Sequence, residues 1–176
     1  NIVEPFTVTA SLRYDKDEKF GDHFSPKVYG VWTLNDNWIV KGGVSTGYKT
    51  PALRATVAGW GQATGGGQSN GMIVGNPDLK PETSINYEAS INWDNNDNLD
   101  AGFTVFNSEF KDKITEIRTC PGAAGSNNCP WLGQQFDFVS QRINVDKANM
   151  RGIETTLGWA ITPDVRWATN YTFTDT

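Results

Sequence analysis

The segment Ser84-Ile85-Asn86-Tyr87-Glu88-Ala89-Ser90-Ile91-Asn92-Trp93 alternates polar and apolar side chains from its first residue to its last. Successive side chains of a β-strand point to opposite faces, so this segment has one polar and one apolar face. The same alternation recurs in other stretches, which span residues 7–15, 27–34, 38–48, 99–105, 153–161 and 165–173. Short connections between several of these stretches make them antiparallel neighbours. The sequence therefore predicts an all-β chain with about seven antiparallel strands.

Charged residues within the predicted strands lie on the polar face. They are Arg13, Lys27, Lys41, Glu88, Asp100, Glu154 and Arg166. A cationic side chain on the lipid face of a barrel costs about 2–4 kcal/mol at the bilayer midplane, so this distribution suits a membrane wall. The strands of a soluble β-sandwich also alternate polar and apolar side chains. The distribution of charges therefore predicts strands, but it does not distinguish a membrane barrel from a soluble sandwich.

The connections between the strands alternate in length. Three are short and polar, namely 35–37, 94–98 and 162–164, and two are long, namely about 49–82 and 111–147. The connection around 16–25 belongs to the long-loop end and is of modest length. Short periplasmic turns at one end and long extracellular loops at the other are typical of outer-membrane barrels.

Most of the tryptophans lie close to the short turns. Those that do so are Trp32, Trp38, Trp93, Trp159 and Trp167. An indole has an apolar ring and one N–H donor, so it prefers the boundary between hydrocarbon and water. A row of such rings at one end of an antiparallel sheet predicts the aromatic girdle of a transmembrane β-barrel.

The overall composition excludes other classes of protein. The net charge of -5 and a pI near 4.8 argue against a nucleic-acid partner. The mean hydropathy is -0.48, and no apolar run approaches the roughly 18 residues of a membrane helix. Barrel strands score as soluble because only alternate residues face lipid, so a barrel stays compatible with these values.

The two cysteines, Cys120 and Cys129, are close in sequence. A local disulfide in an oxidising compartment is the favoured interpretation, and the alternatives are two reduced thiols or half of a metal site. The only histidine, His23, is distant in sequence, which disfavours zinc. His23 also lacks a nucleophile signature, so the sequence indicates that the protein is not an enzyme.

Three motifs identify a family by resemblance. Residues 47–54 (GYKTPALR), 75–84 (GNPDLKPETS) and 144–154 (NVDKANMRGIE) resemble, in order and spacing, motifs of TonB-dependent outer-membrane receptors. Residues 25–54 most resemble the ferric catecholate siderophore and colicin receptor group. The resemblance implies an outer-membrane protein of a Gram-negative bacterium with a 22-stranded barrel. Residues 1–176 would form part of the C-terminal half of that barrel, with the N-terminal plug domain and the TonB-engaging segment absent.

The resemblance also implies a function and partners. The parent protein would take up a ferric siderophore, with iron present only in that ligand and with no cofactor or metal bound by protein side chains. Lipid and lipopolysaccharide, TonB through the absent N-terminal region, and a colicin or phage are the other expected partners. Ligand contacts are expected in the long loops, because cations and aromatic rings complement an anionic, aromatic ferric catecholate. Arg54 and Trp60 are favoured, because both closely follow Gly47-Tyr48 and lack an evident lipid-facing role. The candidates are Lys49, Arg54, Trp60, Gln62, Gln68, Arg118, Trp131, Gln134, Gln135 and Phe136.

Three alternatives stay open at this point. The candidate loop residues can simply pack the loops together. The chain can belong to a passive porin, or to a small outer-membrane barrel with an adhesive or structural role, although its lumen face is mostly Ser, Thr, Asn and Gly. A soluble carbohydrate-binding sandwich requires an exposed aromatic platform, whereas most tryptophans here follow the turns.

Overall fold

The computed structural model describes residues 6–176, and the chain divides into two compact units. The wall unit comprises Asn1–Tyr48, Ser84–Phe110 and Ala148–Thr176, and the loop unit comprises Lys49–Thr83 and Lys111–Lys147. Residues 1–5 of the predicted barrel segment lie outside the described part. No helix within residues 6–176 has the length and apolar character to cross a membrane.

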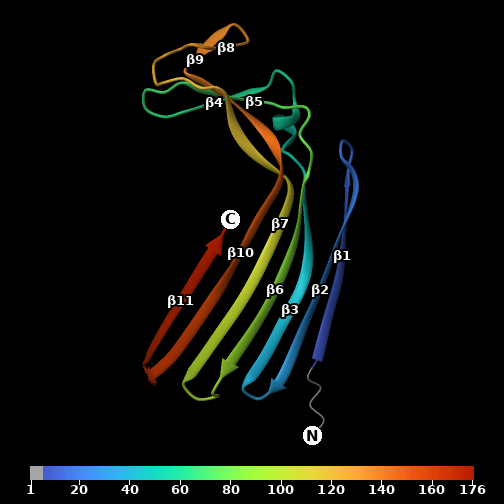
Figure 1. The fold of residues 1–176 in the computed structure, drawn as a ribbon, viewed down its shortest axis with the longest axis vertical. Coiled ribbons are helices and arrows are strands. Elements are labelled where there is room, and N and C mark those ends of the chain that lie inside the picture. The colour runs from blue at the N-terminus through green and yellow to red at the C-terminus, as the bar shows by residue number, and fades with distance from the viewer. Residues whose placement is uncertain (1–5) are drawn as a thin grey trace. The chain divides into compact units, whose positions relative to one another are not determined.

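All seven predicted strands are confirmed, and they form consecutive neighbours of one sheet (Figure 1). They are β1 (Phe6–Asp17), β2 (Gly21–Asn35), β3 (Trp38–Lys49), β6 (Glu82–Asp94), β7 (Leu99–Cys120), β10 (Phe138–Thr162) and β11 (Val165–Asp175). Their order is β1-β2-β3-β6-β7-β10, with β11 paired to β10. The printed registers of β1 with β2, β2 with β3 and β10 with β11 are antiparallel. The all-β, antiparallel wall is therefore confirmed.

The strands run further than the alternation predicted. β7 continues to Cys120 and β10 already begins at Phe138, so both strands enter the stretch expected to be a loop. The connection expected around 16–25 shrinks to residues 18–20, followed by Gly21 with a φ of 79°. Apolar alternation requires two faces in different solvents. It is therefore lost where both faces are mostly exposed, as at the end of β7, and where both are buried, as at Phe138 to Ser140, even though backbone pairing continues.

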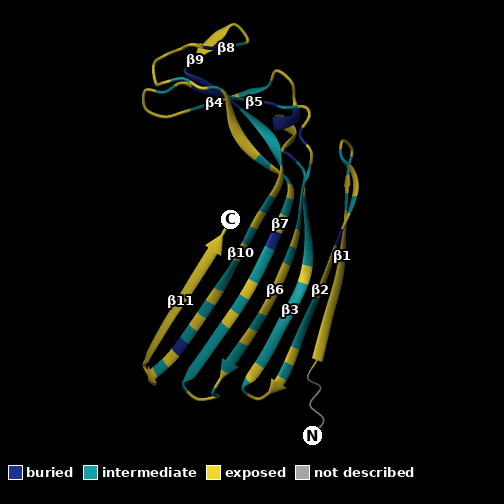
Figure 2. Cartoon of the chain, in the orientation of Figure 1, coloured by how far each residue is buried: buried dark blue, intermediate teal, exposed yellow. Residues whose placement is uncertain are grey.

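Apolar side chains share one face across neighbouring strands. The register sets Val8 opposite Gly30 and Val28 opposite Val44, and the rings of Trp38 and Trp93 lie 6.3 Å apart. Large apolar side chains on this face are exposed, among them Val8, Val28 and Val44, and exposed positions recur along β6, β7 and β10 (Figure 2). An apolar surface of this extent on a soluble monomer is rare, whereas a barrel wall presents it to lipid.

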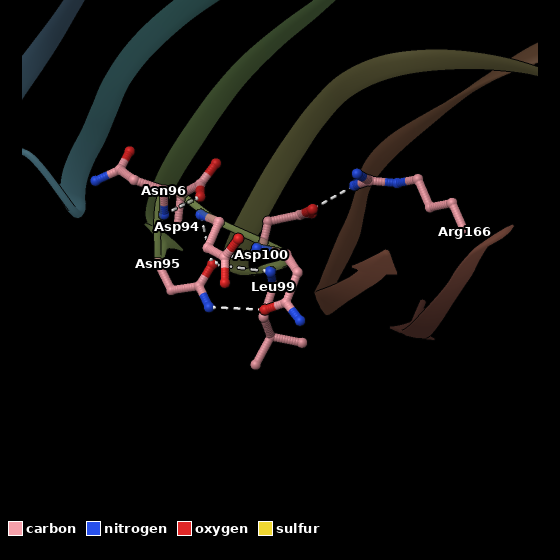
Figure 3. A network of polar contacts seen from close by, with 8 residues as sticks. Asp94, Asn95, Asn96, Leu99, Asp100 and Arg166 are labelled. Atoms are coloured by element: carbon pink, nitrogen blue, oxygen red, sulfur yellow. Dashed lines mark hydrogen bonds and ion pairs between the residues drawn. The ribbon is translucent and has the colours of Figure 1, made fainter. Parts of the chain in front are cut away.

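The turn between β6 and β7 is organised by asparagine side chains (Figure 3). The Asn95 Oδ1 atom accepts hydrogen bonds from the backbone N–H groups of Asp97 (3.0 Å), Asn98 (2.9 Å) and Leu99 (2.9 Å). Asn96 adopts a φ of 59°, a left-handed conformation that asparagine tolerates. These contacts make the Asp- and Asn-rich segment a turn held by its own side chains.

Neighbouring turns are also joined to one another. The Asn37 side chain, in the turn between β2 and β3, donates to the Asp94 carbonyl over 2.6 Å, and the Asp94 N–H donates back to the Asn37 carbonyl over 2.9 Å. The Asn96 side chain donates to the Asp36 carbonyl over 3.0 Å. The turn ends of these two hairpins therefore form one hydrogen-bonded edge.

A salt bridge on the polar face spans three strands. Arg166 on β11 contacts Asp100 on β7, although β10 lies between those strands (Figure 3). Gly158 of β10 makes this possible, because a Cβ atom there would lie 2.6 Å from an Asp100 carboxylate oxygen and would also crowd the Arg166 guanidinium. The missing side chain thus leaves the space in which the two charges meet.

Gly158→Ala is expected to separate Arg166 from Asp100 and to lower the free energy of unfolding of the full-length barrel by about 1 kcal/mol, because the pair is partly exposed. Urea unfolding in micelles measures this loss. In an Arg166→Gln background the same glycine substitution is expected to cost much less. An equal cost in both backgrounds would show that Gly158 acts independently of the ion pair.

Candidate ligand-binding loops

The two long loops fold together into one small unit. It contains the 3-10 helix η1 (Leu53–Thr56) and strands β4 (Gly61–Thr64), β5 (Gly71–Val74), β8 (Cys129–Trp131) and β9 (Gln134–Phe136). β5 pairs in parallel with the start of β10, from Phe138 to Gln141, and β4 pairs antiparallel with β5. Sequence analysis missed these strands because segments of three or four residues carry no measurable alternation.

A disulfide and a small apolar core hold this unit. Cys120 and Cys129 are bonded, with their Cα atoms 5.8 Å apart, which confirms the expected disulfide. Cys129 is fully buried and packs with Met72, Phe136 and Val139. The core therefore joins side chains from both long loops.

The buried carboxylate of Asp137 links the loops through backbone donors. Asp137 is 1% exposed, and its two oxygens accept from the N–H groups of Asn70 over 2.8 Å and Asn127 over 2.9 Å. The Asp137 N–H donates to the Asn70 carbonyl over 2.7 Å. The N–H groups of Asn70, Asn127, Gly125 and Ser126 lower the pKa of Asp137, against the opposing effect of burial. The oxygens of Asp137 accept hydrogen bonds from backbone N–H groups, which stabilise its ionised form. Asp137 therefore has a structural role and is not a metal ligand.

Asn144 of β10 joins the motif segment around Lys80 to Asp112 of β7. Its side chain accepts from the Lys80 N–H over 2.9 Å and donates to the carbonyls of Lys80 (2.9 Å) and Asp112 (2.6 Å). Glu82 accepts from the Ile114 N–H over 2.7 Å. The motif residues around Asn144 therefore act as a scaffold that sets where the loop leaves the strand.

Arg54 and Trp60, the favoured candidates, lie together. The Arg54 guanidinium stands over the Trp60 ring, 5.8 Å from its centroid, and Arg54 is exposed. Lys49 instead forms a 2.9 Å ion pair with Glu82. A guanidinium placed over an aromatic face keeps its N–H donors available. Arg54 is thus both held in place and able to donate to a ligand.

The candidates of the second loop differ in exposure. Arg118 is exposed and lies over the Phe138 ring, 4.2 Å from its centroid. Trp131 is partly buried, with its ring against Gly61, and Phe136 is 4% exposed in the core. Packing thus dominates for Phe136, while Arg118 faces solvent. The remaining candidates, all exposed, are Gln62, Gln68, Gln134 and Gln135.

Sequence analysis did not single out Asp137, Phe138 or Asn144 as functional positions. Several of their partners, such as Asn70 for Asp137 and Lys80 for Asn144, lie in the other long loop, and the sequence around each residue does not indicate such contacts. Within residues 6–176, no group of three or more His, Cys, Asp or Glu is placed to hold a metal ion. His23 stacks on Tyr48, with ring centroids 4.0 Å apart.

Asp137→Asn is expected to loosen the connection between the loops, because the amide replaces one acceptor oxygen by a donor facing N–H groups. Amide exchange at Asn70 and Asn127 in the full-length protein should become about tenfold faster at neutral pH. The pKa of Asp137 is lower in the folded protein than in the unfolded chain. The carboxylate therefore contributes its full stabilisation at pH values above the ordinary pKa of about 4, and this stabilisation is lost as the pH falls through the pKa of the folded state. In acid, the protection of the Asn70 and Asn127 amides from exchange in the native protein should therefore decline to the level seen in Asp137→Asn.

The exposed Asp78→Asn change in the same unit is the matched control and should leave the exchange of both amides unaltered. Equal protection in Asp137→Asn and in the native protein at neutral pH would refute the role given to the carboxylate.

Replacing both Cys120 and Cys129 by serine is expected to lower the stability of the loop unit by somewhat under about 3 kcal/mol, because the disulfide closes a short loop. Protease resistance of the loops across a temperature series measures the change. In the folded native protein, added reductant should have little effect because Cys129 is 0% exposed. Rapid reduction at low temperature would contradict that burial.

Comparison with known proteins agrees with the fold. Residues 1–176 match the family described as TonB dependent receptor-like, beta-barrel. The chain is 45% identical over 174 residues to the iron-regulated outer membrane virulence protein of Vibrio cholerae, covering 98% of the chain and 25% of that protein. It is 30% identical over 177 residues to the ferrienterobactin receptor of Escherichia coli, covering 98% of the chain and 22% of that receptor.

The same relationship holds in three dimensions. The crystal structure of the siderophore receptor PirA from Pseudomonas aeruginosa superposes with a TM-score of 0.82 at 28% identity, covering 98% of the chain and 32% of that structure. The chain spans about a quarter of the length of the curated relatives it matches. The family consists of transport receptors, and relatives of this chain are named outer-membrane proteins. The chain belongs to the β-barrel domain family of TonB-dependent outer-membrane receptors.

Proposed function

We propose that the full-length protein binds a ferric siderophore in its extracellular loops and imports it across the outer membrane. Relatives over the whole chain are siderophore receptors, and one of them is named for ferrienterobactin. The observation that carries the proposal for this chain is the pair of exposed arginines held on aromatic rings, Arg54 on Trp60 and Arg118 on Phe138. Such groups complement an anionic, aromatic ligand.

A catecholate is the siderophore class that these groups fit best. A ferric tris-catecholate carries negative charge on its oxygens and presents aromatic edges and faces. The N–H donors of a stacked guanidinium match the oxygens, and partly buried Trp60 and Trp131 offer rings. The exposed side chains of Gln62, Gln68, Gln134 and Gln135 add hydrogen-bonding groups that tolerate different ligand orientations.

The wall unit supplies the passage in this proposal. Its strands continue a larger barrel that encloses an N-terminal plug, and TonB engages a segment outside this chain to move that plug. The polar face, with the Arg166–Asp100 bridge and the hydrogen bond from Tyr29 to Glu88 of 3.1 Å, faces the plug and the water-filled interior. The apolar face contacts the lipid.

Arg54→Ala in the full-length receptor is expected to weaken ferric-catecholate binding about tenfold, because one charge-assisted hydrogen bond and one pre-positioned cation are lost. Fluorescence quenching or calorimetry with a ferric tris-catecholate measures the dissociation constant. Lys80→Ala is the matched control, since Lys80 is an exposed cation of the same loop whose backbone, not its side chain, contacts Asn144. An affinity unchanged in Arg54→Ala, or equally reduced in Lys80→Ala, would remove Arg54 from the site.

A further inference from the structure

The outward, apolar face of the wall unit contains an open groove of about 880 Å³. Its lining is mostly apolar and comes from β3, β6, β7, β10 and β11. Its outward side chains include Tyr87, Ala89, Val105, Arg151, Ile153 and Asp175. This volume lies within the range of about 300–1,000 Å³ for small-molecule sites.

An ion pair stands at one end of the groove, on the face that is otherwise apolar. The register sets Arg151 opposite Asp175 and Ile153 opposite Phe173, so all four side chains share a face. The Arg151 guanidinium lies 2.8 Å from the Asp175 carboxylate, and the two side chains are 67% and 52% exposed. The charges singled out by sequence analysis all lie on the polar face, so this pair departs from that rule.

The pair lies where the hydrocarbon is expected to end. Arg151 precedes Trp159, a residue of the turn-end girdle, by eight positions on β10. At about 3.3 Å per residue and a strand tilt near 40°, this separation is about 20 Å across the bilayer. The apolar band of an outer-membrane barrel is about 25 Å tall. Arg151 therefore lies near the opposite boundary, at the level of lipid headgroups.

We propose that this groove binds a phosphorylated lipid of the outer leaflet, with an acyl chain along Tyr87, Val105 and Ile153 and a phosphate on Arg151. The apolar part of the groove is continuous with the lipid-facing surface, which favours an acyl chain over a protein segment. An exposed guanidinium at headgroup level complements a phosphate, which it can contact through two N–H donors. Asp175 competes for the same guanidinium and therefore limits the affinity.

Because Asp175 and the phosphate compete for Arg151, substitutions of the two residues should change lipid binding in opposite directions. The full-length receptor is delipidated in detergent, titrated with bisphosphorylated lipid A, and examined by native mass spectrometry for bound lipid. Arg151→Gln should reduce lipid binding about tenfold, because a charge-assisted contact to phosphate is lost. Asp175→Asn should increase binding, because Arg151 is released from its partner. Lipid A stripped of both phosphates should bind the native protein as weakly as it binds Arg151→Gln.

A matched control lies on the other face of the same sheet. Arg13 forms a similar 2.6 Å pair with Asp15, its side chain is 70% exposed, and the register sets it opposite Ser25 on the polar face. Arg13→Gln should leave lipid binding unchanged. Ala89→Trp, which fills the groove without touching the ion pair, should reduce binding of both lipid forms.

The proposal would be overturned if Arg151→Gln bound lipid as well as the native protein does, or if Asp175→Asn bound it less well. It would also be overturned if Arg13→Gln lost as much lipid binding as Arg151→Gln. Displacement of bound lipid by inorganic phosphate alone would show a free-anion site and would also refute it. The inference depends on the outer-membrane wall and not on siderophore uptake, so ferric-catecholate affinity in the same variants tests the proposed function separately.

Discussion

Hydrocarbon offers no partner for a backbone N–H or C=O group, and this constraint determines how the wall unit is built. Each peptide group within the membrane must bond to a neighbouring strand, so the chain crosses as consecutive antiparallel strands. Once the backbone is satisfied in this way, side chains alone distinguish the two surfaces. Val28 and Val44 meet on the outward face, while Arg166 reaches Asp100 on the inward face through the space that Gly158 leaves. The same constraint explains why charges in the middle of the strands face inward.

The strands of the wall unit could be predicted from the sequence where one face of the strand meets lipid and the other meets water. Ile85 to Trp93 and Ile153 to Ile161 alternate because every second residue meets lipid. The first of these strands was predicted nearly to both ends, and the second only to its C-terminal end. The upper part of β7, up to Cys120, and the first part of β10 escaped prediction. Those segments lie in the loop unit, where the end of β7 is mostly exposed and Phe138 to Ser140 of β10 are buried, so neither segment has one face in lipid and the other in water. Arg151 and Asp175 show the same transition, because charge becomes tolerable on the outward face at the headgroup level.

The loops were predictable in residue type and unpredictable in arrangement. Cys120 and Cys129 are close in sequence, so their bond was foreseen. Arg54 and Trp60 were foreseen as candidates because both closely follow Gly47-Tyr48 and lack an evident lipid-facing role. The contact of Arg118 with Phe138 and the hydrogen bond from Asn70 to Asp137 join residues distant in sequence, and only the folded backbone brings them together. The apolar groove likewise depends on five strands, and no single segment encodes it.

The buried Asp137 carboxylate has a consequence for how the connections in the loop unit can be lost. It joins donors that are 67 positions away at Asn70 and 10 away at Asn127, whereas the disulfide closes only a nine-residue separation. Reduction of the disulfide leaves the hydrogen bonds of Asp137 in place, and protonation of Asp137 leaves the disulfide intact. The loop unit therefore has a local closure that responds to redox conditions and a long-range connection that responds to acid, and each can be lost without the other.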